Sequence, residues 1–140
     1  MPSATFTLQT SAPIELLEIT EQIRSACKKS GFKNGLCHVA SGHTTSAIVI
    51  NEKCAELEKD IVQFLKDFAP AQKEYFHNKV ASDGRPNAHS HLLSLTLPSS
   101  VTIAIENGEL QLGTWQRVFF VELDGPREKR TVRCSFVGEK

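Results

Sequence analysis

The dipeptide Asn107-Gly108 stands between two runs of strand-forming residues, 100–105 and 109–112. Asparagine and glycine readily take the positive φ angles of a type I′ turn, so this pattern predicts a β-hairpin. Runs rich in Val, Ile and Leu, or alternating with Thr, predict further strands after Pro13 and at residues 4–8, 35–40, 46–51, 117–123 and 130–137. We therefore expect antiparallel sheets built from about seven strands.

Three other segments are expected to be helical. Residues 21–29 follow Thr20, a candidate N-cap, and stop before Gly31. Residues 88–97 can form one or two helical turns before a proline. The clearest helix is expected at residues 55–68, whose apolar stripe consists of Leu57, Ile61, Phe64, Leu65 and Phe68. The pattern predicts an α+β fold, a single compact domain over residues 1–140 with mostly antiparallel sheets in a sandwich-like core and two or three helices.

Composition excludes several classes of partner. The 16 Lys and Arg residues balance the 16 Asp and Glu residues, so no strong positive field draws the chain to nucleic acid or to an anionic membrane. Apolar runs such as residues 46–50 are far shorter than the roughly 20 residues that span a bilayer, and the N-terminus lacks the pattern of a signal peptide. We expect a cytoplasmic protein whose four cysteines are free thiols.

The segment Ser41-Gly42-His43-Thr44-Thr45-Ser46 interrupts two strand patterns with a glycine, a histidine and four hydroxyl groups. Backbone N–H groups and hydroxyl groups at such a position can surround a phosphate or another anionic oxygen. The same composition also suits a plain connection between strands. Residue types alone leave both interpretations open.

Four of the five histidines, His43, His77, His89 and His91, fall in polar interruptions of the pattern. Neutral imidazole is a common zinc ligand, and histidines on loops beside rigid strands can leave a coordination position open for catalysis. No HExxH-type signature is present, so scattered surface histidines are the alternative. If residues 88–97 are helical, His89 and His91 diverge by about 200° and only one of them points into a shared site.

Carboxylates and one aromatic residue complete the candidate set. Glu52 closes a strand, Asp83 lies in the long polar segment 70–87, and Asp124 precedes a turn, so each can approach the histidines as an acid or base. Each also has a plain structural role as a helix cap or turn residue. Trp115 can stack on a ligand or simply pack against the protein.

In order and spacing, these blocks resemble the YjbQ-like family. The resemblance rests on Ser41 to Ala47 followed by Asn51-Glu52, on Asn87-Ala88-His89-Ser90-His91-Leu92, on Ser100 to Gln116 with Gly113-Thr114-Trp115-Gln116, and on Asp124-Gly125-Pro126-Arg127. It covers almost the whole chain. It implies a compact α+β domain, a homotrimer with sites near subunit boundaries, and the thiamine-phosphate synthase activity attributed to some members.

The resemblance also implies roles for individual residues. His43, His77 and His91 match the histidines expected to bind a divalent metal ion, zinc or magnesium, and His89 is less secure. His43, Glu52 and Asp83 are then the catalytic candidates. The residues expected to bind the small phosphorylated substrate are Gly42, Thr44, Thr45, Asn51 and Trp115.

Two hypotheses of function follow. The first is a metal-assisted enzyme that joins a hydroxymethylpyrimidine pyrophosphate to a thiazole phosphate. This thiamine-phosphate synthase activity is then either its main activity or a secondary one. The second is a protein that binds a metal or a phosphorylated ligand without turnover, since no clear acid/base pair stands out. A homotrimer is expected from the resemblance, and also because residues 118–123 are too apolar for an exposed sheet edge.

Overall fold

The computed structural model describes all 140 residues and contains eight strands, three α-helices and one 3₁₀ turn. The strands are β1 Ser3–Leu8, β2 Glu15–Glu18, β3 Asn34–Ser41, β4 Ser46–Asn51, β5 Ser100–Glu106, β6 Glu109–Leu110, β7 Arg117–Glu122 and β8 Arg130–Glu139. The helices are α1 Thr20–Ser30, α2 Ala55–Phe68 and α3 Ala88–Thr96, and the 3₁₀ turn η1 spans His77–Lys79. These elements confirm the expected α+β fold.

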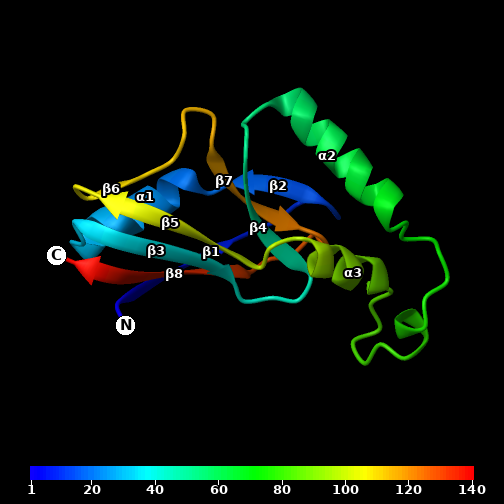
Figure 1. Ribbon diagram of the computed structural model, residues 1–140. Helices are drawn as coiled ribbons and strands as arrows, with labels where there is room; N and C mark the ends of the chain where they lie inside the picture. The colour runs from blue at the N-terminus through cyan, green and yellow to red at the C-terminus, as the bar shows by residue number, and fades with distance from the viewer.

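Two antiparallel sheets curl toward each other as a half-barrel (Figure 1). The larger sheet has the order β1-β8-β3-β5-β6 and the smaller one the order β2-β7-β4. A cluster of 15 buried apolar residues fills the space between the two sheets and α1. A second cluster of seven joins the other face of the smaller sheet to α2 and α3. The smaller sheet is therefore covered on both faces.

The predicted hairpin is present. Asn107 and Gly108 have φ angles of 52° and 81°, and Ile105 pairs with Leu110 across the turn. The type I′ requirement for two positive φ angles explains why this dipeptide marks the turn so clearly.

The strand β7 is not a sheet edge, and this corrects one argument for an oligomer. It lies between β2 and β4, and four of its apolar residues, from Val118 to Val121, are buried. A strand covered on both faces needs a continuous apolar run rather than an alternating one. The apolar character of β7 is thus explained within one subunit.

The start of α1 also differs from the expectation. Thr20 is not the N-cap, because helical geometry begins with Thr20 itself and Ile19 precedes it without a capping side chain. Instead, the Thr20 hydroxyl accepts a hydrogen bond of 2.9 Å from the backbone N–H of Val118 in β7. The helix ends at Gly31 with a φ of 77°, as predicted.

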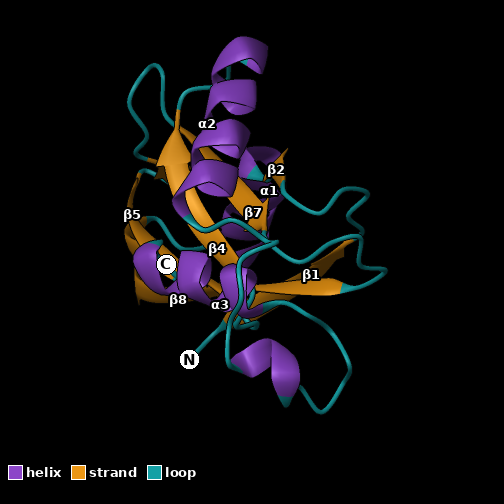
Figure 2. Ribbon diagram, turned by 90° about the vertical axis from the view of Figure 1, so that its right-hand side faces the viewer, coloured by secondary structure: helices purple, strands orange, loops and turns teal.

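The helix α2 has the predicted bounds but buries little of its apolar stripe. Only Leu65 is buried, whereas Phe64 is 64% exposed and Phe68 is 59% exposed, and their rings stack with centroids 6.0 Å apart. Figure 2 shows α2 extending beyond the sheets, and Ile61 and Val62 are only partly buried against the second cluster. The longest helix, α2, has 14 residues, and none of the three helices provides an apolar stretch of the length that a membrane span requires.

A buried ion pair links the two sheets where β7 ends and β8 begins. Arg130 of β8 donates to Glu122 of β7 from Nε over 2.8 Å, and both side chains are almost fully buried. Thr10 also donates to Glu122 over 2.9 Å, and the Arg130 Nη2 donates to the Thr45 hydroxyl over 2.9 Å. Burial raises the pKa of Glu122, but the hydrogen bonds from Arg130, the Asp124 backbone and Thr10 outweigh it, so this pKa lies below its ordinary value.

We predict that Glu122→Gln lowers the free energy of unfolding by about 3 kcal/mol, because the buried Arg130 charge loses its partner. Urea denaturation measures this loss. The matched control is Glu58→Gln, which removes an exposed pair with Lys53 and is expected to cost less than about 1 kcal/mol. Equal losses in both variants would contradict the assigned role of the buried pair.

The same pair predicts the sign of a pH dependence. Since the pKa of Glu122 is lower in the folded state, its contribution is complete above the unfolded-state value of about 4.3 and is lost as the pH falls through the folded value. Stability curves of Glu122→Gln and the unmodified protein should therefore converge in acid.

Candidate functional site

A polar cavity of about 310 Å³ opens where the two sheets meet. None of its nine lining residues is hydrophobic: they are Gly42, His43, Thr44, Thr45, Asp83, Asn87, His91, Arg127 and Arg130. They come from the connection between β3 and β4, the segment before α3, α3 itself, and the region from the β7–β8 connection to the start of β8. Four segments far apart in the sequence therefore form one site.

The connection between β3 and β4 is held at this end by backbone hydrogen bonds to both sheets. Gly42 N–H donates to the Thr131 carbonyl over 3.3 Å, and Leu123 N–H donates to the Thr45 carbonyl over 3.2 Å. Because β3 belongs to the larger sheet and β4 to the smaller one, residues 42–45 must cross between them. This crossing places their hydroxyl and imidazole groups at the mouth of the half-barrel.

His43 is oriented by the backbone of β8. Thr131 N–H donates to His43 Nε2 over 2.8 Å, so Nε2 carries the lone pair and Nδ1 carries the hydrogen in the neutral ring. Burial and the nearby Arg130 charge lower the pKa of His43 below its ordinary value, which favours the neutral ring. His43 is therefore a hydrogen-bond donor through Nδ1.

The two cavity arginines are each anchored by a carboxylate and keep one nitrogen free. Arg130 uses Nε and Nη2 toward Glu122 and Thr45, and Arg127 uses Nε and Nη2 toward Asp124. No hydrogen bond within the protein involves Nη1 of either residue. Both guanidinium groups are thus held in place, and each keeps Nη1 as a donor for a ligand.

An apolar groove of about 400 Å³ adjoins the polar cavity and shares His91 with it. Its lining residues are Tyr75, Phe76, His77, Ala88, His91 and Leu92. The rings of His77 and His91 meet edge to face with centroids 4.9 Å apart, and His77 Nε2 lies 3.1 Å from Asn87 Oδ1. His91 therefore lines both hollows, whereas His77 lines only the groove.

The three histidines do not form a ready ligand set. No group of three or more His, Cys, Asp or Glu side chains is arranged to hold one metal ion. The Nε2 lone pair of His43 is already used by Thr131 N–H, whereas His77 and His91 each keep a free ring nitrogen. The geometry does not fit one ion bound by His43, His77 and His91 together, although it leaves two imidazole ligands available.

His89 points away from His91, as the helical spacing predicted. It lines two other hollows, one of them together with Arg85 and Asp124. Its Nδ1 atom is buried without a hydrogen-bond partner, and burial lowers its pKa. His89 therefore takes no part in the polar cavity.

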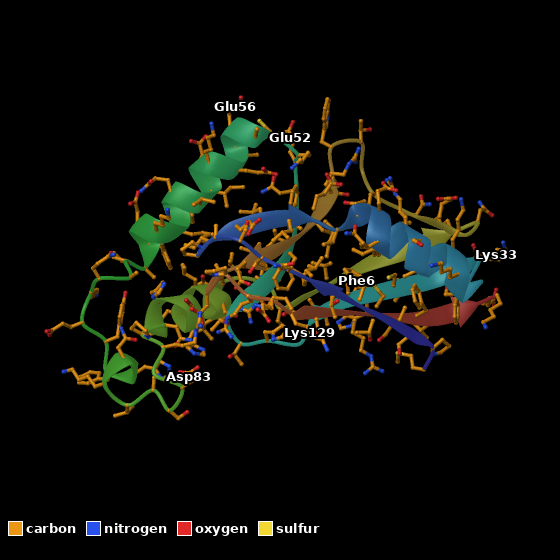
Figure 3. The ribbon with its side chains drawn as sticks, turned by 180° about the vertical axis from the view of Figure 1, so that it is seen from behind. Phe6, Lys33, Glu52, Glu56, Asp83 and Lys129 are labelled. Carbon is orange, nitrogen blue, oxygen red and sulfur yellow. The ribbon has the colours of Figure 1, made fainter.

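The structure brings together some of the residues predicted from the sequence and separates others. Of the catalytic candidates, His43 and Asp83 line the cavity, and the substrate-binding candidates Gly42, Thr44 and Thr45 line it too. Figure 3 places Glu52 near the start of α2, far from Asp83. Asn51 and Trp115 are both exposed, and neither lines the cavity.

Sequence reasoning did not select Asn87, Arg127 or Arg130 as site residues. Glu122 directly follows the apolar run Val118 to Val121 and Arg130 opens the next strand, so a charged residue at the end of each strand pattern was the available signal. Pairing the two required knowing that β7 and β8 lie in different sheets that meet at this end.

Comparisons with known proteins agree with this architecture. The profile described as UPF0047 protein YjbQ-like matches residues 4–139. A UPF0047 protein of Methanothermobacter thermautotrophicus is 42% identical over 94% of this chain and 89% of its own length. UPF0047 protein YugU of Bacillus subtilis is 30% identical over 96% of this chain and 98% of its own.

Solved structures give the same result. A YbjQ-like protein of unknown function from Sulfolobus solfataricus superimposes with a TM-score of 0.93 at 36% identity, covering 99% of this chain and 97% of that one. A hypothetical protein from Aeropyrum pernix has the same TM-score at 37% identity, covering 99% of this chain and 100% of that one. The chain therefore belongs to the YjbQ-like UPF0047 family.

Proposed function

We propose that the polar cavity binds the phosphate groups of a small phosphorylated molecule. The observation that carries the proposal is that His43, Arg127 and Arg130 line one cavity without hydrophobic residues. His43 Nδ1 and the Nη1 groups of both arginines have no hydrogen-bond partner within the protein, so they are donors left for a ligand. Phosphate oxygens accept hydrogen bonds strongly from such donors, and each bond to a charged group contributes about 1.5–3 kcal/mol. Thr44 and Thr45 hydroxyl groups add donors beside them.

The balance of charge in the cavity favours an anion that is held by directed hydrogen bonds. Glu122 and Asp124 offset much of the two arginine charges, so attraction at long range is weak. The same carboxylates hold the guanidinium groups rigid, which lowers the entropy cost of binding. Recognition then depends on geometry more than on net charge.

The apolar groove supports a ligand with two parts. It lies next to the cavity, and Tyr75, Phe76 and Leu92 provide apolar contact for a flat ring. A phosphorylated heterocycle can place its phosphate in the polar cavity and its ring in this groove.

For the reaction, we propose the transfer suggested by the resemblance, thiamine-phosphate synthesis. The thiazole nitrogen forms a C–N bond with the methylene carbon of the hydroxymethylpyrimidine, and the C–O bond to pyrophosphate breaks with its electron pair leaving on oxygen. His43 Nδ1 and the arginines would stabilise the charge that develops on the departing oxygen.

A divalent cation is part of the proposal, at His77 and His91 rather than at all three histidines. Imidazole nitrogens suit Zn²⁺, whereas Mg²⁺ prefers oxygen ligands. When bound there, the cation would supply positive charge next to the leaving pyrophosphate.

One observation favours the alternative of binding without turnover. Glu122 and Asp124 are engaged by arginines and do not line the cavity. Asp83 is the only carboxylate that does. Asp83 is exposed, and its Oδ1 accepts from Arg85 N–H over 3.0 Å. A proton-transfer partner within one chain is therefore limited to this loop residue and the histidines.

We predict that inorganic pyrophosphate binds to the protein and that His43→Ala weakens this binding by at least about tenfold, the loss of one hydrogen bond to a charged group. Isothermal titration calorimetry measures both affinities. His38→Ala, which changes an exposed histidine on β3, is the control and should bind as the unmodified protein does. Equal affinities for all three proteins would remove the cavity as the binding site.

A turnover measurement distinguishes the enzyme hypothesis from the hypothesis of binding without turnover. Formation of thiamine phosphate from the two phosphorylated precursors, followed with isotope-labelled substrate, is expected for the unmodified protein and for His38→Ala but not for His43→Ala. Pyrophosphate binding without any product would favour the binding protein.

A further prediction concerns the metal ligands. Zn²⁺ affinity should fall at least about tenfold in His77→Gln and in His91→Gln, since even loss of a ligand's supporting hydrogen bond has an effect of that size. His43→Gln should bind Zn²⁺ almost unchanged, because its lone pair is used by Thr131 N–H. Titration calorimetry on protein without a histidine tag measures the three values. A comparable loss in His43→Gln would restore the three-histidine site.

We also propose the homotrimer, supported by the resemblance and by the apolar surface that α2 and α3 leave uncovered. Phe64, Phe68 and Leu95 are each more than half exposed, and such surfaces commonly mark interfaces. Light scattering should give three times the 15.5 kDa mass of the chain, and Phe64→Glu should lower it. Val137→Glu, on an exposed position of β8, is the control. A monomeric mass at micromolar concentration would contradict the trimer.

A further inference from the structure

Asp124 lies just outside the polar cavity, yet hydrogen bonds link it to Asn87 of that cavity and, through Asn87, to His77 of the apolar groove. It accepts a hydrogen bond of 2.8 Å from Asn87 Nδ2, and Asn87 Oδ1 in turn lies 3.1 Å from His77 Nε2. We propose that Asp124 is a positioning residue which, through Asn87, fixes His77 as the tautomer with hydrogen on Nε2 and a lone pair on Nδ1.

The carboxylate of Asp124 is well suited to this role because it is firmly held and ionised. Its side chain is only 10% exposed and accepts hydrogen bonds from Arg85 Nε over 3.2 Å and Arg127 Nη2 over 2.7 Å. Burial raises the pKa of Asp124, but these bonds and the one from Asn87 outweigh it and keep the pKa below its ordinary value. An ionised carboxylate offers only acceptors to its neighbours.

The orientation of the Asn87 amide follows from that carboxylate. The group facing Asp124 must be a donor, so it is Nδ2, and the group facing His77 is therefore the carbonyl oxygen Oδ1. Asn87 is 4% exposed, so a reversed amide would set its oxygen against the carboxylate with little water to compensate.

The tautomer of His77 follows from Asn87. An amide oxygen can only accept, so His77 Nε2 must carry the hydrogen, and a neutral imidazole has only one. The lone pair then lies on Nδ1. Because His77 is exposed and its ring meets His91 at the apolar groove, Nδ1 is open to a ligand there.

The same carboxylate also holds the polar cavity in shape. Arg127 Nη2 and Asn87 Nδ2 both donate to Oδ2 of Asp124, and both residues line the cavity. One side chain thus orients an arginine for the phosphate and a histidine beside the groove. The value of this arrangement for the reaction rests on the proposed function, whereas the tautomer of His77 does not.

The test is ¹⁵N NMR of the imidazole nitrogens at pH 8, where free imidazole is neutral, since two-bond correlations distinguish the tautomers. The His77 signals are assigned as those missing from His77→Gln. The unmodified protein should show the pure Nε2–H form. In Asp124→Ala the two nitrogen shifts should move toward the averaged values of free histidine, because the amide of Asn87 is no longer held.

Arg85→Ala is the matched control. It removes another partner of Asp124 and loosens the same loop, but leaves the bond between Asp124 and Asn87, so it should keep the pure Nε2–H form. Asn87→Leu removes the middle residue of the hydrogen-bonded series Asp124–Asn87–His77 and should give the same averaged shifts. It replaces Asp124→Ala in the test if Asp124→Ala does not fold.

Three results would overturn the inference: an Nδ1–H or mixed form in the unmodified protein, a pure Nε2–H form in folded Asp124→Ala, or equal averaging in Arg85→Ala. Pyrophosphate affinity, measured on the same samples, keeps the two proposals apart. A protein with the predicted tautomer but no affinity for pyrophosphate would contradict the proposed function and would still support the positioning of His77 by Asp124 through Asn87.

Discussion

The buried pair of Glu122 and Arg130 is the contact on which the rest of the structure depends. It joins the end of β7 in the smaller sheet to the start of β8 in the larger one, at the open end of the half-barrel. Two desolvated charges are costly unless they meet with good geometry, so a shift of one sheet against the other here would leave a buried charge unpaired. Thr10 and Thr45 complete its hydrogen bonds, and the polar cavity forms on the same residues.

The site beside this ion pair has two chemically different halves. Toward the sheets, His43, Arg127 and Arg130 present donors, and each is oriented by a backbone or carboxylate partner. Toward α3 and η1, the groove presents aromatic and aliphatic side chains. His91 borders both halves, so a ligand that fills both must pass it. Such a division matches a molecule with a phosphate at one end and a ring at the other.

Much of the fold could be predicted because its determinants are local. The hairpin at Asn107-Gly108 depends on two φ angles, and the end of α1 depends on the positive φ of Gly31. The bounds of α2 were predicted correctly for the same reason, but the exposure of Phe64 and Phe68 was not. Periodicity shows which residues share a face of a helix, whereas the surface that the face meets is a property of the whole molecule.

For the site, the sequence alone determined the chemistry that the segments can offer. The hydroxyl groups and His43 between two strands, and the histidines before and within α3, were visible as polar interruptions of apolar patterns. Only the tertiary structure decided which of them meet: it brings His43, Asp83 and His91 to one cavity with Arg127 and Arg130, and leaves Glu52, Asn51 and Trp115 outside it. The physical reason is that side-chain spacing within a strand or helix is set by the backbone geometry of that element, whereas distances between elements follow from how two sheets pack. In this protein, that packing brings together a charge pair whose members are eight residues apart in sequence yet lie in different sheets.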